Sequence, residues 1–109
     1  MIDAIAKAAG LKLRKTRHTK PPAGTYGVYM DAVEAGGADG VNCIRRHDYT
    51  LEVYSITADE AEKAESAVED ALDARGIPWT KQGRYWLQEE QRYQEVYEFT
   101  YIEKRRISN

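Results

Sequence analysis

The chain has 109 residues, of which 42% are hydrophobic and 31% are charged, with a formal net charge of −2. This composition is typical of one soluble globular domain with a single modest core, and no apolar run approaches the ~20 residues of a membrane-spanning helix. The single cysteine, Cys43, excludes an internal disulfide and favours synthesis in a reducing compartment. We therefore expect no membrane partner.

Charge is distributed unevenly along the chain. Residues 1–30 carry six basic groups and one acidic group, which gives +5, whereas residues 31–109 carry ten basic and seventeen acidic groups, which gives −7. The basic segment 12–20 could bind nucleic acid, an acidic neighbour or the acidic body of a second copy. Because this segment has no aromatic residue for base stacking, nucleic acid is the less supported partner. Its charged-patch candidates are Lys12, Arg14, Lys15 and Arg17.

The N-terminal region predicts one short helix. Apolar residues share one side of residues 2–9, and Gly10 is a suitable helix stop. Leucines then alternate with basic residues over 11–14, which is a weak strand signal, and Pro21–Pro22 breaks regular structure. We interpret residues 1–24 as a helix followed by a basic connector.

Alternating apolar positions predict two strands, at 25–30 and 47–56. The segment 31–46 between them has a glycine-rich middle typical of a hairpin tip, and a loop of this length is usually functional or mobile. Either the strands continue outward as a projecting arm or the segment orders only when a partner binds; we describe it as a projecting mobile loop. Its candidates for an assembly interface are Asp31, Glu34, Gly36, Gly37, Asp39, Gly40, Arg45 and Arg46.

A second helix is predicted from Thr57 to Arg75. Thr57 and Glu60 form a capping-box pattern, and Gly76 follows as the terminator. The stripe expected to be buried consists of Ala61, Ala64, Val68, Ala71 and Leu72. The opposite face is acidic and is expected to be solvated; its charged-patch candidates include Glu62, Glu65 and Glu69.

Two further strands are predicted at 79–88 and 91–104, the second of which is unusually long. Its aromatic face, with Tyr93, Glu95, Tyr97, Phe99 and Tyr101, is expected to pack under the second helix. Its other face needs cover from neighbouring copies, so Val96, Thr100 and Ile102 are interface candidates. The predicted fold is α+β, an antiparallel sheet of two long hairpins with two helices in the order α-β-β-α-β-β.

The sequence offers little support for catalysis. It has no phosphate-binding glycine loop and no nucleophile elbow, and Cys43 with His47 supplies fewer ligands than a zinc site needs. Glu95 could have a raised pKa among tyrosines, or could accept a hydrogen bond from a tyrosine hydroxyl. We expect no catalytic residue, metal or cofactor. A small-molecule-binding or enzymatic α+β domain, the alternative, would need a deep polar pocket.

Tyrosine is in excess, with eight residues against one phenylalanine. Its apolar ring and polar hydroxyl suit surfaces that are buried only on association, although a wet edge of the core would explain the same composition.

Several short motifs then occur in a fixed order. They are YGVYMD at 26–31, GADG at 37–40 with Asn42, HDYTLEVY at 47–54, Leu72-Asp73 with Gly76-Ile77 after the helix, QEEQRYQ at 88–94 and YEFTYIEK at 97–104. In this order and spacing, the chain resembles the tail terminator or head–tail joining (tail completion) proteins of long-tailed bacteriophages and prophages over residues 26–104.

The resemblance implies a single tail-terminator-like domain over 1–109 whose copies form a hexameric ring in the assembled tail, and it leaves open whether the free protein is a monomer. Such a ring ends the tail tube and contacts the tail-tube protein and the head connector or head-completion protein, with DNA only as passing cargo. It implies a location in the tail or neck of a virion, assembly in the cytoplasm of a bacterial host, and no enzymatic activity. A closed ring needs two complementary patches on each subunit, and the basic segment or Arg45–Arg46 against the acidic helix is one pairing.

Overall fold

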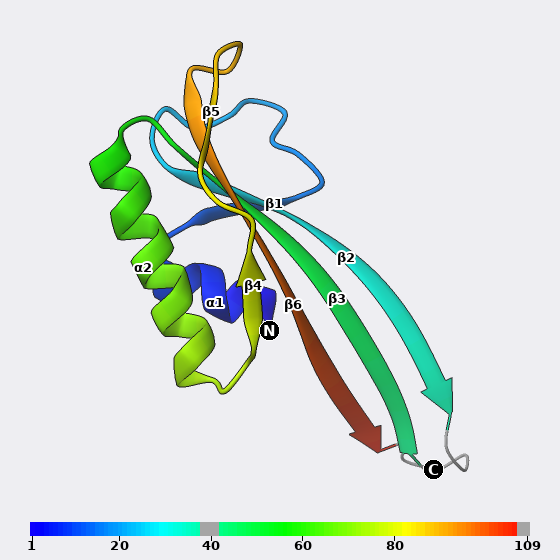
Figure 1. The fold of residues 1–109 in the computed structure, drawn as a ribbon. Helices are drawn as coiled ribbons and strands as arrows, with labels where there is room; N and C mark the ends of the chain where they lie inside the picture. Colours follow the sequence, from blue (N-terminus) through cyan, green and yellow to red (C-terminus); the bar gives the residue numbers. More distant parts are fainter. Residues whose placement is uncertain (38–41, 107–109) are drawn as a thin grey trace.

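The computed structural model describes residues 1–37 and 42–106, and at 36, 37, 42, 43, 105 and 106 it describes the backbone alone. Two helices and six strands follow in the order α1 (Ile2–Ala9), β1 (Lys12–Lys15), β2 (Tyr26–Gly37), β3 (Asn42–Ser55), α2 (Ala58–Ala74), β4 (Trp79–Lys81), β5 (Tyr85–Leu87) and β6 (Arg92–Arg106). The strands form one sheet in the order β1-β2-β3-β6-β4, with β5 also paired to β6 (Figure 1). The predicted α+β class and its α-β-β-α-β-β order are confirmed.

Three long antiparallel strands dominate the sheet. β2 pairs with β3 from Tyr26↔Tyr54 to Gly37↔Cys43, and β3 pairs with β6 from Ser55↔Tyr93 to Asn42↔Arg106. Partners that lie directly opposite share a face, so the register fixes which side chains meet. The predicted alternation of β3 and β6 is confirmed, because the helix side buries Tyr49, Leu51, Val53, Tyr97 and Phe99.

Both helices lie on the same face of the sheet and leave the other face without a helix (Figure 1). α2 turns its alanines inward, which allows a close approach to β3 and β6, and Val68 and Leu72 are fully buried there. α1 adds Ile5 to the same core and packs against α2. Neither helix is long and apolar enough to cross a membrane.

The ends of both helices follow their predicted signals. The Thr57 hydroxyl accepts a hydrogen bond from the Glu60 N–H at 3.1 Å, which caps α2. Gly10 ends α1 with a φ of 70°, a left-handed conformation that favours glycine.

The predicted strand over 79–88 is wrong in its middle. β4 and β5 are separate short strands that both pair with β6, and the chain leaves the ladder after Gln82, whose N–H still donates to the Val96 carbonyl at 3.1 Å. Gly83 has a φ of 116°, and its N–H donates to the buried Glu95 carboxylate at 2.9 Å. In a continuous ladder the Gly83 N–H would point away from β6, because the Gln82 N–H already donates to that strand; here the Glu95 carboxylate accepts it.

The connector after α1 is more regular than predicted. β1 pairs in parallel with the first residues of β2, so part of the 1–24 segment is strand. Gly27 leaves room for it, because a Cβ there would lie 3.2 Å from the Leu13 side chain. The weak alternation over 11–14 was therefore a strand signal.

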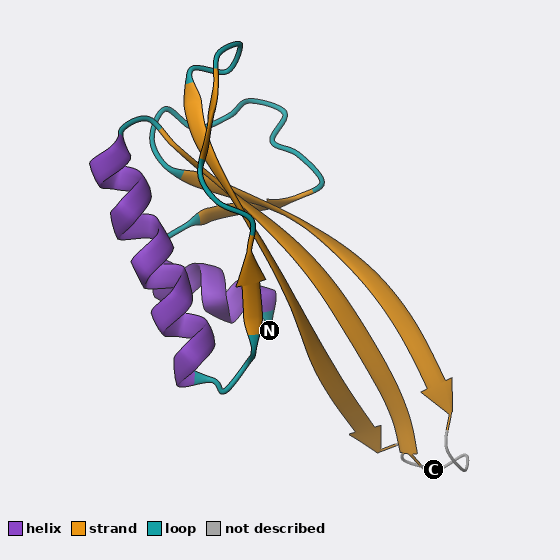
Figure 2. Ribbon diagram, viewed as in Figure 1, coloured by secondary structure: helices purple, strands orange, loops and turns teal. Residues whose placement is uncertain are grey.

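The 31–46 segment is largely strand rather than loop. β2 continues to Gly37 and β3 begins at Asn42, which corresponds to the first of the two alternatives, strands that continue outward. Asp39 and Gly40 lie outside the described residues. Together with the end of β6, these strands sweep away from the helices, and the molecule measures 51 × 29 × 21 Å (Figure 2).

Candidate assembly interface

The most distinctive surface is this three-stranded extension, which we call the arm: residues 30–37 of β2, 42–48 of β3 and 100–106 of β6. The strands continue because the ladder is unbroken and because β3 and β6 contain neither glycine nor proline. No helix packs on the far part of the arm in the described chain (Figure 1). The arm is therefore a thin sheet with two accessible faces.

His47 ties the three strands together at the root of the arm. Its Nδ1 lies 2.9 Å from the Asp31 carboxylate on β2, and its Nε2 lies 3.4 Å from the Glu103 carboxylate on β6. The imidazole stacks on Tyr49, with ring centres 5.5 Å apart and planes 7° apart. We call this group the His47 clamp. The His47 side chain is only 14% exposed, so this imidazole is largely buried.

The clamp is linked to the aromatic core. Burial and the nearby Asp31 carboxylate raise the pKa of Tyr49 to about 12, so its hydroxyl stays protonated at neutral pH. The Tyr49 ring contacts Phe99 on one side and Tyr29 on the other, with centroid distances of 5.4 and 6.2 Å. The root of the arm is thus rigidly joined to the helix-covered part of the sheet.

Farther out, the arm exposes apolar side chains. Ile102 and Ile44, diagonal neighbours on the helix-free face, are 54% and 39% exposed, and Met30, on the same face but nearer the core, is 44% exposed. Val33, on the opposite face, is 51% exposed. These exposed apolar residues, three on one face and one on the other, make the arm the candidate contact surface.

The interface candidates predicted from the sequence occupy different environments. Ile102 is exposed, whereas Val96 is half-buried and the Thr100 hydroxyl donates to Asp48 at 2.7 Å. This bond from Thr100 lowers the pKa of Asp48, and Arg46 lowers it further from 3.2 Å. The remaining candidates on β2 and β3 are Asp31 in the clamp, the exposed Glu34, the half-buried Arg45, and Gly36 and Gly37 at the end of β2.

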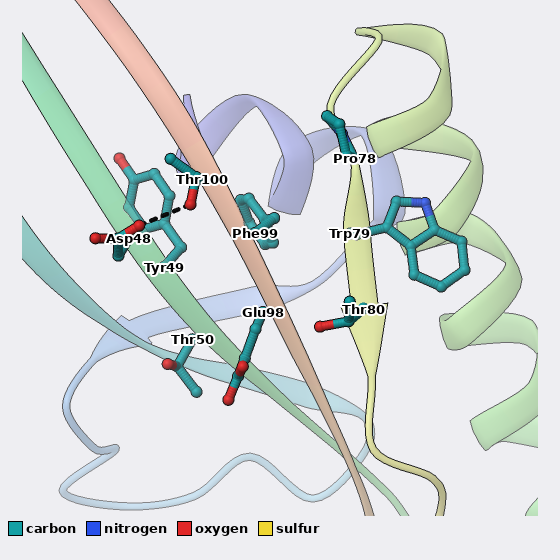
Figure 3. Close-up of a pocket in the computed structure, with 9 residues that line it drawn as sticks. All are labelled: Asp48, Tyr49, Thr50, Pro78, Trp79, Thr80, Glu98, Phe99 and Thr100. Carbon is teal, nitrogen blue, oxygen red and sulfur yellow. Dashed lines mark hydrogen bonds between the residues drawn. The ribbon is translucent and has the colours of Figure 1, made fainter.

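A shallow groove of about 560 Å³ lies between β4 and the neighbouring strands β3 and β6. Figure 3 shows Thr80 pointing toward Glu98, while Trp79 points toward α2, where its indole N–H donates to Asp73 at 2.8 Å. Carboxylate and hydroxyl groups line the groove without an imidazole or a thiol. Among the described residues, no group of three or more His, Cys, Asp or Glu could hold a metal. Its hydroxyl–carboxylate pair is Thr100 with Asp48, and the hydrogen bond between them lowers the pKa of Asp48, which makes this carboxylate a weaker base.

The acidic face of α2 is smaller than predicted, because two of its acids turn toward the sheet. Glu65 is 6% exposed and accepts from Arg84 at 2.7 Å, and Glu69 binds Lys81 at 2.9 Å. Glu69 also accepts the Tyr97 hydroxyl at 2.6 Å, and burial followed by this bond raises the pKa of Tyr97. The prediction of a solvated patch is wrong for these two residues, because cations from β4 and the 82–84 segment reach them.

Glu62 stays exposed, as do the basic candidates Lys12, Arg14, Lys15 and Arg17. The connector after β1 folds back on the sheet, where Arg92 donates to the carbonyl of Ala23 at 3.3 Å and His18 packs on Tyr26. This covers the end of the helix-free face opposite to the arm. Glu95 accepts from the Gly83 and Val96 N–H groups, so the predicted bond from a tyrosine hydroxyl is wrong.

The His47 clamp is the feature that the sequence reasoning missed. Asp31, His47 and Glu103 lie far apart in the chain, and only the register brings them together. The sequence did contain one indication of it: Asp31 and Glu103 are acidic residues at positions of the neighbouring strands that face the same side of the sheet as His47.

The sequence matches no protein-family model and no curated protein. Among 21 matching chains of solved structures, one belongs to a structure described as the virion of a native gene transfer agent particle. It shares 19% sequence identity with this protein at a TM-score of 0.60, and the match covers 88% of this chain and 81% of that chain. At this identity the likeness establishes a shared fold.

Proposed function

We propose that this protein is a structural component of a phage-like virion whose copies form a ring that ends a tail tube and joins the tail to the head. The observation that carries the proposal is the arm, which exposes four large apolar side chains beyond the helix-covered core. A subunit of an assembly would bury these side chains against a neighbour. The fold shared with a chain of a gene transfer agent virion and the resemblance to tail terminator proteins support the same role.

In this role the subunit needs no catalytic group. The strongly coupled ionisable groups, Glu65 with Arg84 and Glu69 with Lys81 and Tyr97, bind one another and hold the 82–84 segment on α2. The groove of Figure 3 is open, and its hydroxyl–carboxylate pair, Thr100 with Asp48, contains a carboxylate of lowered pKa. These features disfavour the enzymatic alternative, and we place the tail-tube protein and the head connector as the partners.

Light scattering coupled to size-exclusion chromatography tests the proposal, with and without a tail-tube protein. Six copies of 12.4 kDa give about 74 kDa for the ring, which we expect at least when the tube protein is present. The double variant V33D/I102D should stay monomeric because it charges both faces of the arm. Ile56→Asp is the matched control, since Ile56 is 40% exposed but lies at the other end of the sheet. A wild-type monomer under both conditions would contradict the proposal.

The basic segment 12–20 supports a second candidate, a nucleic-acid-binding adaptor, because its four candidate cations are all exposed. Retention on DNA at low salt, lost when these cations are replaced, would favour the adaptor.

A further inference from the structure

The arm has two strand edges that no described strand covers. β1 follows β2 only as far as Tyr29, so the outer edge of β2 is open from Met30 to Gly37. β4 follows β6 only as far as Phe99, so the outer edge of β6 is open from Thr100 to Arg106. Pro78 precedes β4 and has no N–H to extend that ladder.

The β2 edge lacks two of the features that usually prevent strands from pairing, and the basic residues of the β6 edge oppose pairing only with a like-charged edge. The open stretch of β2 contains no lysine and no proline, and it exposes Met30 and Val33. An open edge of this kind pairs with another chain unless charge, proline or a bulge blocks it. The two edges are of similar length, eight residues on β2 and seven on β6.

The two edges also have opposite charge. Residues 30–37 contain two acids and no base, which gives −2, and residues 100–106 contain one acid and three bases, which gives +2. Asp31 and Glu103 lie at the His47 clamp, so among the charged side chains that the structure describes on these edges the exposed ones are Glu34 and Lys104, which the register places on the same face. Like edges therefore repel and unlike edges attract, which favours a head-to-tail contact over a two-fold one.

The topology fixes the direction of such a contact. β2 and β6 are both antiparallel to β3, so they run in the same direction within one subunit. Rotation about a ring axis roughly along the strands preserves this direction. We infer that the β2 edge of one copy pairs in parallel with the β6 edge of the next copy, so that the sheet continues around the ring. This inference rests on the proposed ring and names its contact.

Charge exchange tests which surfaces meet. Glu34→Lys and Lys104→Glu should each weaken ring formation at least fivefold, and the double variant E34K/K104E should restore most of it. Glu62→Lys, the matched control on α2, should leave the ring unchanged. An unaffected ring in both single variants would overturn the inference, and so would loss of the ring in Glu62→Lys alone, which would place the contact on the helix.

Disulfide trapping tests the direction. In a C43S background, one cysteine is placed at Ala32 or Glu34 and another at Ile102 or Lys104, and intersubunit crosslinks are measured by mass. In parallel pairing, shifting the β2 cysteine by two residues toward the C-terminus shifts the β6 position that crosslinks most strongly by two residues in the same direction. A strongest crosslink that shifts toward the N-terminus of β6 would overturn the inference, and so would crosslinks no stronger than those from a cysteine at Glu62. If a ring of about 74 kDa still forms in that case, the proposed function stands. A wild-type chain that never oligomerises would overturn both.

Discussion

Replacing His47 by alanine should loosen the arm from the core. The imidazole is 14% exposed and contacts carboxylates on both neighbouring strands, at 2.9 Å to Asp31 and 3.4 Å to Glu103. A hydrogen bond to a charged group contributes about 1.5–3 kcal/mol, and its loss leaves the Asp31 carboxylate, itself 12% exposed, without that partner. We expect the free energy of unfolding to fall by about 2 kcal/mol.

Urea denaturation measures the loss, and hydrogen exchange of arm amides shows whether it is local. His47→Phe separates the two contributions, because it keeps a ring on Tyr49 but removes both carboxylate contacts. If the clamp acts through Asp31, the double variant H47A/D31A should be more stable than the sum of the two single losses implies, by about 1 kcal/mol or more. Additive effects, or a loss below about 0.5 kcal/mol for His47→Ala, would refute the clamp.

Three other predictions follow from the ion pairs, the tyrosines and the basic segment. Glu65→Ala should lower the denaturation midpoint clearly more than Glu62→Ala, because only Glu65 is buried against Arg84; equal midpoints would contradict this. The free energy of unfolding should fall between pH about 10 and about 12, because the folded state keeps the Tyr49 proton up to the higher pH whereas the unfolded state loses it near the lower one. Thermal melts across this pH range should show a shallower fall for Tyr49→Phe. An unchanged slope in that variant would be inconsistent with the raised pKa of Tyr49. If the protein has the structural role, its basic segment 12–20 should not bind it to a DNA column at low salt. Binding that is lost when salt is added would favour the nucleic-acid-binding adaptor.

Much of the fold was predictable because local patterns agree with it. The capping pattern at Thr57, the alanine stripe of α2 and the aromatic face of β6 each depend on neighbouring residues, and the structure confirms all three. The period of two along β6 also identified Ile102 as a position that needs cover, and Ile102 is exposed in the subunit.

The sequence predictions that were wrong share a physical cause: polar side chains bind partners that are far away in the sequence. Glu65 was grouped with the solvated acids of α2, although it lies four residues after Ala61 and three before Val68, at the edge of the buried stripe. There it binds Arg84, which is 19 residues away in the sequence. The strand pattern of 79–88 gives no sign that the Glu95 carboxylate will take the N–H of Gly83. The His47 clamp likewise needs the register of three strands, which no local pattern specifies.

Electron microscopy of tail tubes polymerised with and without this protein tests the central claim most directly. The account predicts one ring at a single end of each tube, tubes that stop growing once the ring is present, and loss of the ring in the V33D/I102D variant. Tubes of unchanged length, with the protein unbound or scattered along their walls, would contradict it.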